Sequence, residues 1–177
     1  ETADAILIVG SHIRWEAALV NVRIRKAVKR GARVFVVGPH WDTTYPAEFL
    51  GDDLSVLGEL PKHVVEAFKG AERPAIIMGG AALAKGALGA GLAFAESYGL
   101  VKDGWNGFNV LHSAASRVGG LDIGFVPGEG GRNVAEMTNG AVDVLFNLGA
   151  DEVEIAPGAF VVYIGTHGDR GAHRADG

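Results

Sequence analysis

The feature that most limits what this chain can fold into is an apolar run that ends at glycine and leads into an amphipathic stretch. In ADAILIVGSHIRWEA, residues 3–17, the run from Ala5 to Val9 stops at Gly10, and polar residues follow. A continuous apolar run of this length is typical of a strand buried on both faces of a parallel sheet. A strand, a glycine and a helix start in this order also cradle phosphates in many α/β proteins, because the first helical N–H groups lack intrahelical partners. The stretch is therefore either a nucleotide cradle or a plain connection.

The same pattern returns in the last third of the chain. An aspartate stands six residues before a glycine in Asp4–Gly10 and again in Asp143–Gly149, with a mostly apolar run between them. The stretches 32–40 and 159–167 also share alanine, glycine and histidine at the same offsets. We infer two βαβ units of one pattern, whose strands end at the carboxyl edge where open α/β sheets bind ligands. The parallel neighbours are expected to be the strands at 6–9 and 34–37, and those at 144–148 and 160–164.

The spacing of apolar residues predicts further elements around these strands. A third strand is expected at 74–78. Helices are expected at 14–30, 61–68 and 81–98, with a helical stretch at 108–118 and one helical turn at 151–156. Residues 42–58 read as a crossover loop. The predicted fold class is a Rossmann-like parallel sheet built from duplicated βαβ units, divided into residues 1–70 and 71–177.

Composition excludes several functional classes. The 177 residues include no cysteine, which removes disulfides, thiolate metal sites and the usual ligands of iron–sulfur clusters. The net charge of −5, with basic residues scattered or gathered at one helix end, does not indicate a nucleic-acid partner. No apolar stretch reaches the roughly 18 residues of a membrane span, and no signal-peptide pattern is present. We expect a cytoplasmic chain without direct membrane insertion, which is a compact fragment of a longer subunit.

Five stretches, in order, carry a resemblance to a known family. The chain is similar nearly end to end to the large iron–sulfur subunits of respiratory NADH:quinone oxidoreductase, complex I, in the cysteine-free region that is itself similar to molybdopterin oxidoreductases. The stretches are WEAALVNVRIRKA, VFVVGPHWDTTYPAEFLGDD, NVLHSAASRVGGLDIGFVPG, VLFNLGAD and VVYIGTHGDRGAHRAD.

The resemblance implies a role in an enzyme that passes electrons from NADH to quinone and pumps protons. It implies iron–sulfur clusters in the upstream part of the full subunit and partners among the other peripheral-arm subunits. In molybdopterin relatives the first loop usually carries Asn-Pro after its glycine, and the second strand commonly ends in aspartate. Here His12-Ile13 and Gly38 stand at those positions, so both depart from the cofactor-binding pattern.

We therefore expect a vestigial pocket with no cofactor bound and no catalytic residue. Ser11 is expected to cap the following helix. The residues expected to form the pocket at the carboxyl edge are Gly10, Ser11, His12, Gly38, Pro39, Gly149, Ala150 and Asp151.

Several other side chains have a structural interpretation as well as a functional one. His167, Asp169 and His173 carry groups that bind zinc or iron, but their spacing matches no specific metal motif, and we favour an ion pair of Asp169 with Arg170. The three tryptophans, at positions 15, 41 and 105, offer rings that stack on bases, although packing or a subunit contact is the more common use.

Three hypotheses follow. The first is a non-catalytic scaffold region of the complex I subunit, which we favour because the expected polar contacts at His12, Ile13 and Gly38 are missing. The second is a working nucleotide or molybdopterin-guanine-dinucleotide-binding module. The third is an independent α/β enzyme acting on a phosphorylated small molecule, for which the sequence offers no positioned base.

Overall fold

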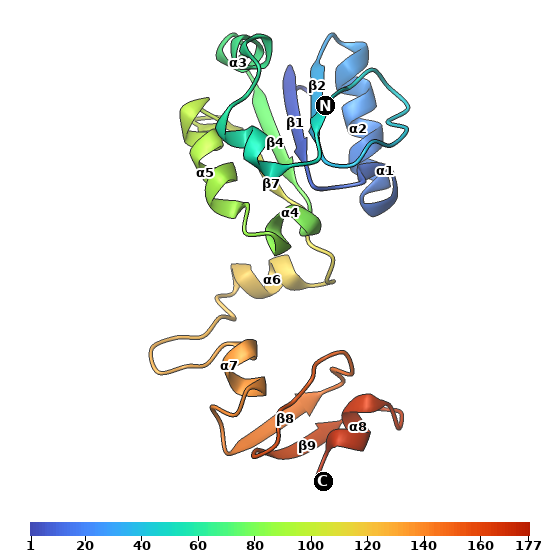
Figure 1. Ribbon diagram of the computed structural model, residues 1–177, viewed down its shortest axis with the longest axis vertical. Coiled ribbons are helices and arrows are strands. Elements are labelled where there is room, and N and C mark those ends of the chain that lie inside the picture. Colours follow the sequence, from blue (N-terminus) through green and yellow to red (C-terminus); the bar gives the residue numbers. More distant parts are fainter. The chain divides into compact units, whose positions relative to one another are not determined.

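The computed structural model describes residues 1–177, which form two compact units, Glu1–Ala115 and Ser116–Gly177 (Figure 1). The sequence placed the division between residues 70 and 71 instead. The observed boundary lies later because the strand at Pro74–Met78 pairs with the strand at Ala5–Val9 and so joins the first sheet. Each unit is described below by itself.

The first unit is built on a five-stranded parallel sheet in the order β3-β2-β1-β4-β7. The central strand β1 pairs with both of its neighbours over five residues and is buried along its whole length, because helices cover both faces of the sheet. This explains its uninterrupted apolar sequence. The strands are β1 (Ala5–Val9), β2 (Arg33–Val37), β3 (Glu48–Gly51), β4 (Pro74–Met78) and β7 (Phe108–Val110).

Helices cover both faces of this sheet (Figure 1). On one face, Ile6 and Ile8 of β1 pack with Ile24 of α2. On the other face, Leu7 packs in one cluster with Phe68 of α3 and other helical side chains. The helices of this unit are α1 (Ile13–Glu16), α2 (Ala18–Lys29), the 3₁₀ helix η1 (Leu54–Gly58), α3 (Lys62–Lys69), α4 (Gly80–Ala84) and α5 (Leu88–Ser97), and a short antiparallel hairpin joins β5 (Val101–Lys102) to β6 (Trp105–Asn106).

Several elements differ from the sequence prediction. The helix expected at 14–30 is interrupted at Ala17, whose φ of −148° and ψ of 64° are not helical. The helix expected at 81–98 is two helices separated near Gly86, which has a φ of +77°. The helical stretch expected at 108–118 is wrong, because residues 108–110 form β7 on the edge of β4, and the expected loop at 42–58 contains the edge strand β3.

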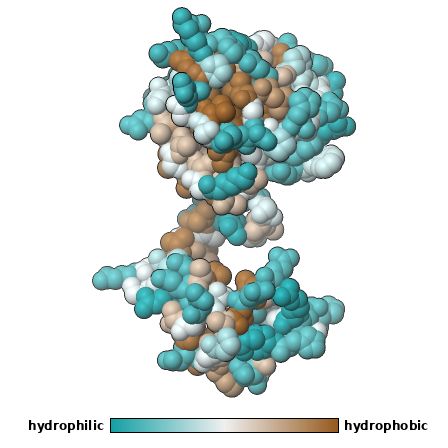
Figure 2. Space-filling view, in the orientation of Figure 1, coloured by the Kyte–Doolittle hydropathy of each residue, from teal (hydrophilic) through white to brown (hydrophobic).

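The second unit contains a two-stranded parallel sheet and three short helices. The crossover between its strands holds no helix, so the helical turn expected at 151–156 is wrong. Figure 2 shows apolar surface around α6 and the segment that follows it, where Leu121, Ile123 and Phe125 are exposed. The elements are α6 (Arg117–Asp122), α7 (Val134–Thr138), β8 (Val144–Leu148), β9 (Phe160–Ile164) and α8 (Arg170–Arg174).

Both predicted strand pairs are parallel neighbours. The first pair runs in register from Ala5 opposite Arg33, and the second from Val144 opposite Phe160, each over five residues. The two pairs belong to separate sheets. None of the helices combines the length and the apolar character that crossing a bilayer requires.

Candidate functional site

The loop that follows β1 is shaped by close packing against the loop that follows β4. Gly10 has a φ of +59°, and a Cβ at this position would lie 2.6 Å from the backbone nitrogen of Ala82. Gly79 meets the same loop from the other side, where a Cβ would collide with Gly10 O and lie 2.5 Å from Ser11 Cβ. Both glycines are therefore explained by backbone contact between two neighbouring strand ends, without any ligand.

The backbone N–H that opens the first helix is already bound by a carboxylate of the same chain. Glu16 Oε1 accepts a hydrogen bond from His12 N at 2.8 Å, and Glu16 Oε2 accepts one from Ser11 Oγ at 2.8 Å. The expected capping role of Ser11 is therefore wrong, since its hydroxyl donates to Glu16 and makes no cap bond. A negative side chain thus lies at the helix start and accepts an N–H that a phosphate would otherwise use.

The imidazole of His12 is held in an aromatic stack. Its ring centroid lies 4.2 Å from that of Trp15 and 4.6 Å from that of Trp41. Its Nδ1 atom is buried without a hydrogen-bond partner. Trp41 is buried in the core beside α2, as the packing interpretation predicted, whereas Trp15 is 80% exposed.

The end of β2 offers neither a carboxylate to accept from ribose hydroxyls nor an unbound N–H at residues 38 and 39. Gly38 N donates to Gly51 O of β3 at 2.8 Å, and Pro39 has no N–H to donate. The nearest acidic residue downstream, Asp42, binds Arg14 at 2.7 Å. The pocket residues predicted in the first unit thus lie at one edge of the sheet, where Ser11 Oγ and His12 N bind Glu16 and Gly38 N binds Gly51 O, while His12 Nδ1 has no partner.

The second unit repeats this arrangement at the end of β8. Asp151 Oδ1 accepts hydrogen bonds from Tyr163 Oη at 3.1 Å and from Gly171 N, in the first turn of α8, at 3.0 Å. Partial desolvation and the hydrogen bond to Asp151 raise the pKa of Tyr163. Asn147 closes the loop by bonding both N and O of Ala150. A carboxylate again binds the N–H at a helix start.

Gly149, Ala150 and Asp151 lie in the second unit, and the other five predicted pocket residues lie in the first. That all eight line one crevice stays a prediction.

A depression of 510 Å³ opens at the carboxyl edge of the first sheet, beside the ends of β4 and β7. Its only charged lining side chain, apart from histidine, is Glu16. No lysine or arginine lines it, so its electrostatic character is unfavourable for phosphate. The lining residues are Glu16, Gly80, Ala81, Leu111, His112 and Ser113.

A family model described as molybdopterin oxidoreductase matches residues 1–176. The chain belongs to the molybdopterin oxidoreductase family. Among its relatives, the NADH-ubiquinone oxidoreductase 78 kDa subunit of Neurospora crassa is 40% identical over 99% of this chain and 24% of the relative. NADH dehydrogenase [ubiquinone] iron-sulfur protein 1 of Solanum tuberosum is also 40% identical over 99% of this chain and 24% of the relative. The NADH-ubiquinone oxidoreductase 75 kDa subunit of Reclinomonas americana is 38% identical over 99% of this chain and 27% of the relative.

The chain spans about a quarter of the length of the relatives it matches. Within this molybdopterin oxidoreductase domain, the residues present do not fit the anionic part of a molybdopterin. Glu16 takes the N–H of His12, and the adjoining depression has no cationic lysine or arginine to balance a phosphate. The sequence departs from the cofactor-binding pattern at His12 and Gly38. In addition, the carboxylate of Glu16 already accepts the N–H of His12, which an anion could otherwise bind.

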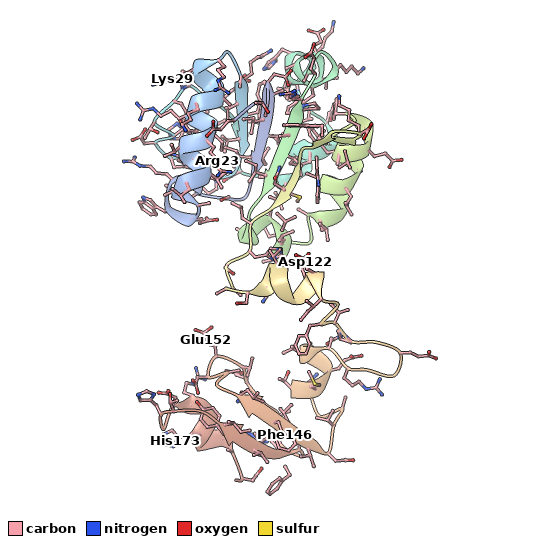
Figure 3. All side chains as sticks on the ribbon, turned by 180° about the vertical axis from the view of Figure 1, so that it is seen from behind. Arg23, Lys29, Asp122, Phe146, Glu152 and His173 are labelled. Atoms are coloured by element: carbon pink, nitrogen blue, oxygen red, sulfur yellow. The ribbon has the colours of Figure 1, made fainter.

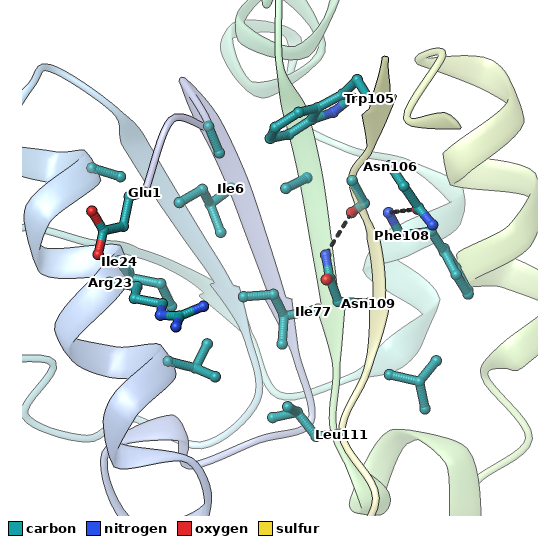
Figure 4. Close-up of a pocket in the computed structure, with 16 residues that line it drawn as sticks. Glu1, Ile6, Arg23, Ile24, Ile77, Trp105, Asn106, Phe108, Asn109 and Leu111 are labelled. Atoms are coloured by element: carbon teal, nitrogen blue, oxygen red, sulfur yellow. Dashed lines mark hydrogen bonds between the residues drawn. The ribbon is translucent and has the colours of Figure 1, made fainter. Parts of the chain in front are cut away.

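A second hollow of 430 Å³ lies between α2 and the strands β4 and β7 (Figure 4). Its floor is apolar and includes Ile6, Ile77 and Leu111. Two of the polar side chains around it bind the backbone, since Asn109 Nδ2 donates to Gly107 O at 3.0 Å and Trp105 Nε1 donates to Pro74 O at 2.9 Å. This hollow has no arrangement of acid, base or nucleophile.

The groups weighed as metal ligands near the C-terminus do not come together as a site. No group of three or more His, Cys, Asp or Glu side chains has the geometry of a metal site. The predicted ion pair of Asp169 with Arg170 is wrong, because Arg170 lies 3.9 Å from Glu154 instead. His167 Nδ1 contacts Thr166 Oγ1 at 2.8 Å.

Proposed function

We propose that this chain is a non-catalytic scaffold region of the large iron–sulfur subunit of a proton-pumping NADH:quinone oxidoreductase. The names of its relatives and the molybdopterin oxidoreductase family support the assignment to that subunit. In such an enzyme, which carries electrons from NADH to quinone, this region would support the fold of the subunit and take no part in the transfer. The thiolates that hold clusters would have to come from the rest of the subunit, because this chain has no cysteine.

One observation supports the non-catalytic part of the proposal: a carboxylate of the chain itself binds a backbone N–H at the start of α1 and another in the first turn of α8. Glu16 does so beside His12, and Asp151 does so beside Gly171. A phosphate entering either position would have to displace a hydrogen-bonded carboxylate or lie against its charge. At about 4 Å, two like charges in a partly solvated site repel by about 4 kcal/mol, which offsets about half of the binding free energy of a micromolar ligand and moves its dissociation constant to about millimolar.

The proposal also assigns partners and place. The partners would be other subunits of the peripheral arm, and in bacteria that arm would lie on the cytoplasmic side of the membrane. Neither nucleic acid nor direct membrane insertion forms part of the proposal.

The proposal is tested by ligand binding to the purified full-length subunit. Calorimetric titration with GMP and GDP is expected to give dissociation constants weaker than roughly millimolar. Fluorescence of acid-released pterin is expected to stay at the level of a blank. Low-micromolar binding or stoichiometric pterin would overturn the scaffold proposal in favour of a working molybdopterin-guanine-dinucleotide module.

A further inference from the structure

The strand pair of the second unit has one apolar face that is largely exposed. Side chains alternate between the two faces of a strand, so every second residue of β8 and of its partner β9 lies on this face. Phe146, labelled on β8 in Figure 3, is 61% exposed. The opposite face is covered, since Asn147 and Val161 are buried and α8 contacts β9. The residues of the exposed face are Val144, Phe146 and Leu148 of β8 and Phe160, Val162 and Ile164 of β9.

The outer edge of β9 already binds backbone groups in the manner of another strand. Tyr163 N donates to Gly177 O at 3.0 Å, and Gly177 N donates to Val161 O at 3.3 Å. A residue that donates to the residue before Val162 and accepts from the residue after it has the hydrogen-bond pattern of a parallel pair. Gly177 therefore lies opposite Val162 in a parallel register. A Cβ at position 177 would lie 3.7 Å from the ring of Phe160, which is on the exposed face, as this register requires.

The residues after α8 are held against this edge by their own side chains. Ala175 is extended, with a φ of −71° and a ψ of 151°. Asp176 binds β9 twice, since its N donates to Val161 O at 2.8 Å and its Oδ2 accepts from Val161 N at 2.9 Å. Arg174 Nη2 donates to Ala156 O at 2.9 Å, in the connection between β8 and β9. β9, α8 and the extended residues thus follow one another as the parts of a βαβ unit do.

We propose that the segment that follows Gly177 in the full-length subunit adds to the outer edge of β9 as a third parallel strand. In the register that Gly177 sets, the second residue of that segment lies opposite Ile164, donates to Tyr163 O and accepts from Gly165 N. We expect this residue to be apolar, because its side chain extends the exposed apolar face. The inference rests on the proposed function in taking this chain to be part of a longer subunit, as its share of the relatives' length indicates.

A strand from a different polypeptide or from a second copy of this chain fits the edge less well. Such a strand would have to displace the hydrogen bonds that residues 176 and 177 make with β9. A third strand from the same chain keeps all of these bonds. It also gives the sheet a more usual form, because a pair of strands alone is marginally stable in water and parallel sheets are normally extended and covered on both faces.

Site-specific photocross-linking of the full-length subunit in the assembled enzyme tests the proposal. A benzophenone amino acid replaces Ile164, and the matched variant replaces Leu148, which lies opposite Ile164 on β8 and so is one strand farther from the proposed position. The expected result is an adduct from position 164 to the first few residues after Gly177 of the same polypeptide, in a higher yield than from position 148. An adduct to another polypeptide, to a second copy of the chain or to a different part of the same chain would overturn the proposal. So would equal yields from the two positions.

Amide hydrogen exchange in the full-length subunit gives an independent test. Gly165 N is the donor that the third strand binds, whereas Gly168 N lies beyond the proposed pairing. Gly165 N is expected to exchange at least about a hundredfold more slowly than Gly168 N, and Asp176→Ala is expected to reduce this difference about tenfold, because Asp176 anchors the start of the strand. Asp176→Asn keeps an acceptor for Val161 N and is expected to keep the slow exchange.

Equal exchange at the two glycines in the unchanged subunit would overturn the third strand. Slow exchange at Gly165 that Asp176→Ala leaves unaltered would also overturn it, because the protection would then come from another contact. Nucleotide binding in the titrations above would overturn the scaffold proposal and leave both of these results unaffected.

Discussion

Glu16 Oε1 lies 2.8 Å from His12 N, so the acidic side chain four residues along the chain closes the turn that a phosphate would otherwise enter. Its second oxygen binds Ser11 Oγ at the same distance. The stretch SHIRWE thus contains its own anion, and the strand, glycine and helix around it work as a connection. In the second unit, Asp151 Oδ1 likewise accepts a hydrogen bond from a backbone N–H in the first turn of a helix, that of Gly171, although the two residues are 20 positions apart.

Glu16→Ala is expected to lower the free energy of unfolding by about 1 kcal/mol, because two hydrogen bonds of an exposed carboxylate are lost. Chemical denaturation measures this loss. The variant is also expected to gain stabilisation from excess inorganic phosphate, relative to chloride at equal ionic strength, that the unchanged chain lacks. Glu66→Ala, which removes only an exposed pair with Lys62 at 3.9 Å, serves as the control and is expected to change stability by less than about 0.5 kcal/mol. Equal phosphate effects in the Glu16→Ala and unchanged chains would contradict the filled-site interpretation.

Two adjacent glycines are expected to respond in opposite directions to the same substitution. Gly79→Ala forces a methyl group against Gly10 O and Ser11 Cβ, and is expected to cost about 1–3 kcal/mol of stability. Gly80→Ala places the methyl in open space in the first turn of α4, and is expected to stabilise the chain by about 0.4–1 kcal/mol. Thermal unfolding of the two variants compares them directly. Equal effects would show that the two loops are not in the contact described.

The strands with the strongest apolar signal were predictable from sequence because their burial on both faces leaves a continuous run of apolar residues. This holds for β1 and β4, which are buried along their whole length. The parallel pairing of β8 with β9 was predictable from the repeated pattern instead, since both strands are largely exposed. The edge strands β3 and β7 were missed, because a short edge strand has one neighbour and needs no such run. A local sequence pattern also could not reveal the division into two units. This division depends on which strands pair when they are far apart in the sequence.

The candidate site was predictable in its position but not in its chemistry. The glycine and the polar residues at 10–12 mark the end of a strand, and the structure places them at the sheet edge. The residue that decides the electrostatics is Glu16, which lies within the predicted helix and has no role in the sequence-based prediction. The available signal in the sequence was an acidic residue, Glu16, four positions after the residue that precedes the helix. Asp151 was predicted as a pocket residue, but its partners Tyr163 and Gly171 lie 12 and 20 residues away.

A buried tyrosine gives the first unit a dependence on alkaline pH. Tyr45 Oη donates to Asn21 Oδ1 at 2.9 Å, and burial raises the pKa of Tyr45 above its ordinary value of 10.0. Because the pKa in the folded state is the higher one, the stabilisation is fully present below pH 10.0 and is lost as the pH rises toward the folded value. The free energy of unfolding is expected to fall by up to about 1.4 kcal/mol for each pH unit in that window.

Tyr45→Phe is expected to remove this alkaline dependence and to cost about 1–3 kcal/mol at neutral pH, since the buried Asn21 loses its donor. Denaturation at a series of pH values measures both effects. Tyr98→Phe keeps Tyr45 and is expected to keep the alkaline slope. A Tyr45→Phe variant with an unchanged slope would contradict the assignment.

The second unit provides the most direct test of a carboxylate at a helix start, because its hydrogen-bond partner titrates. Asp151 raises the pKa of Tyr163 through a hydrogen bond and through its charge, whereas Asp169 acts through charge alone, and desolvation remains the largest cause. Asp151→Asn is therefore expected to lower the pKa of Tyr163 more than Asp169→Asn does, with both values still above that of a free tyrosine. Ultraviolet titration of tyrosinate measures the shift, and Tyr163→Phe identifies the transition.

The raised pKa of Tyr163 in the folded state also makes stability depend on pH. The stabilisation from Tyr163 is lost as pH rises through that pKa, and Asp151→Asn is expected to move this loss to lower pH. An order reversed between the two aspartates would show that Asp151 does not bind Tyr163 in solution.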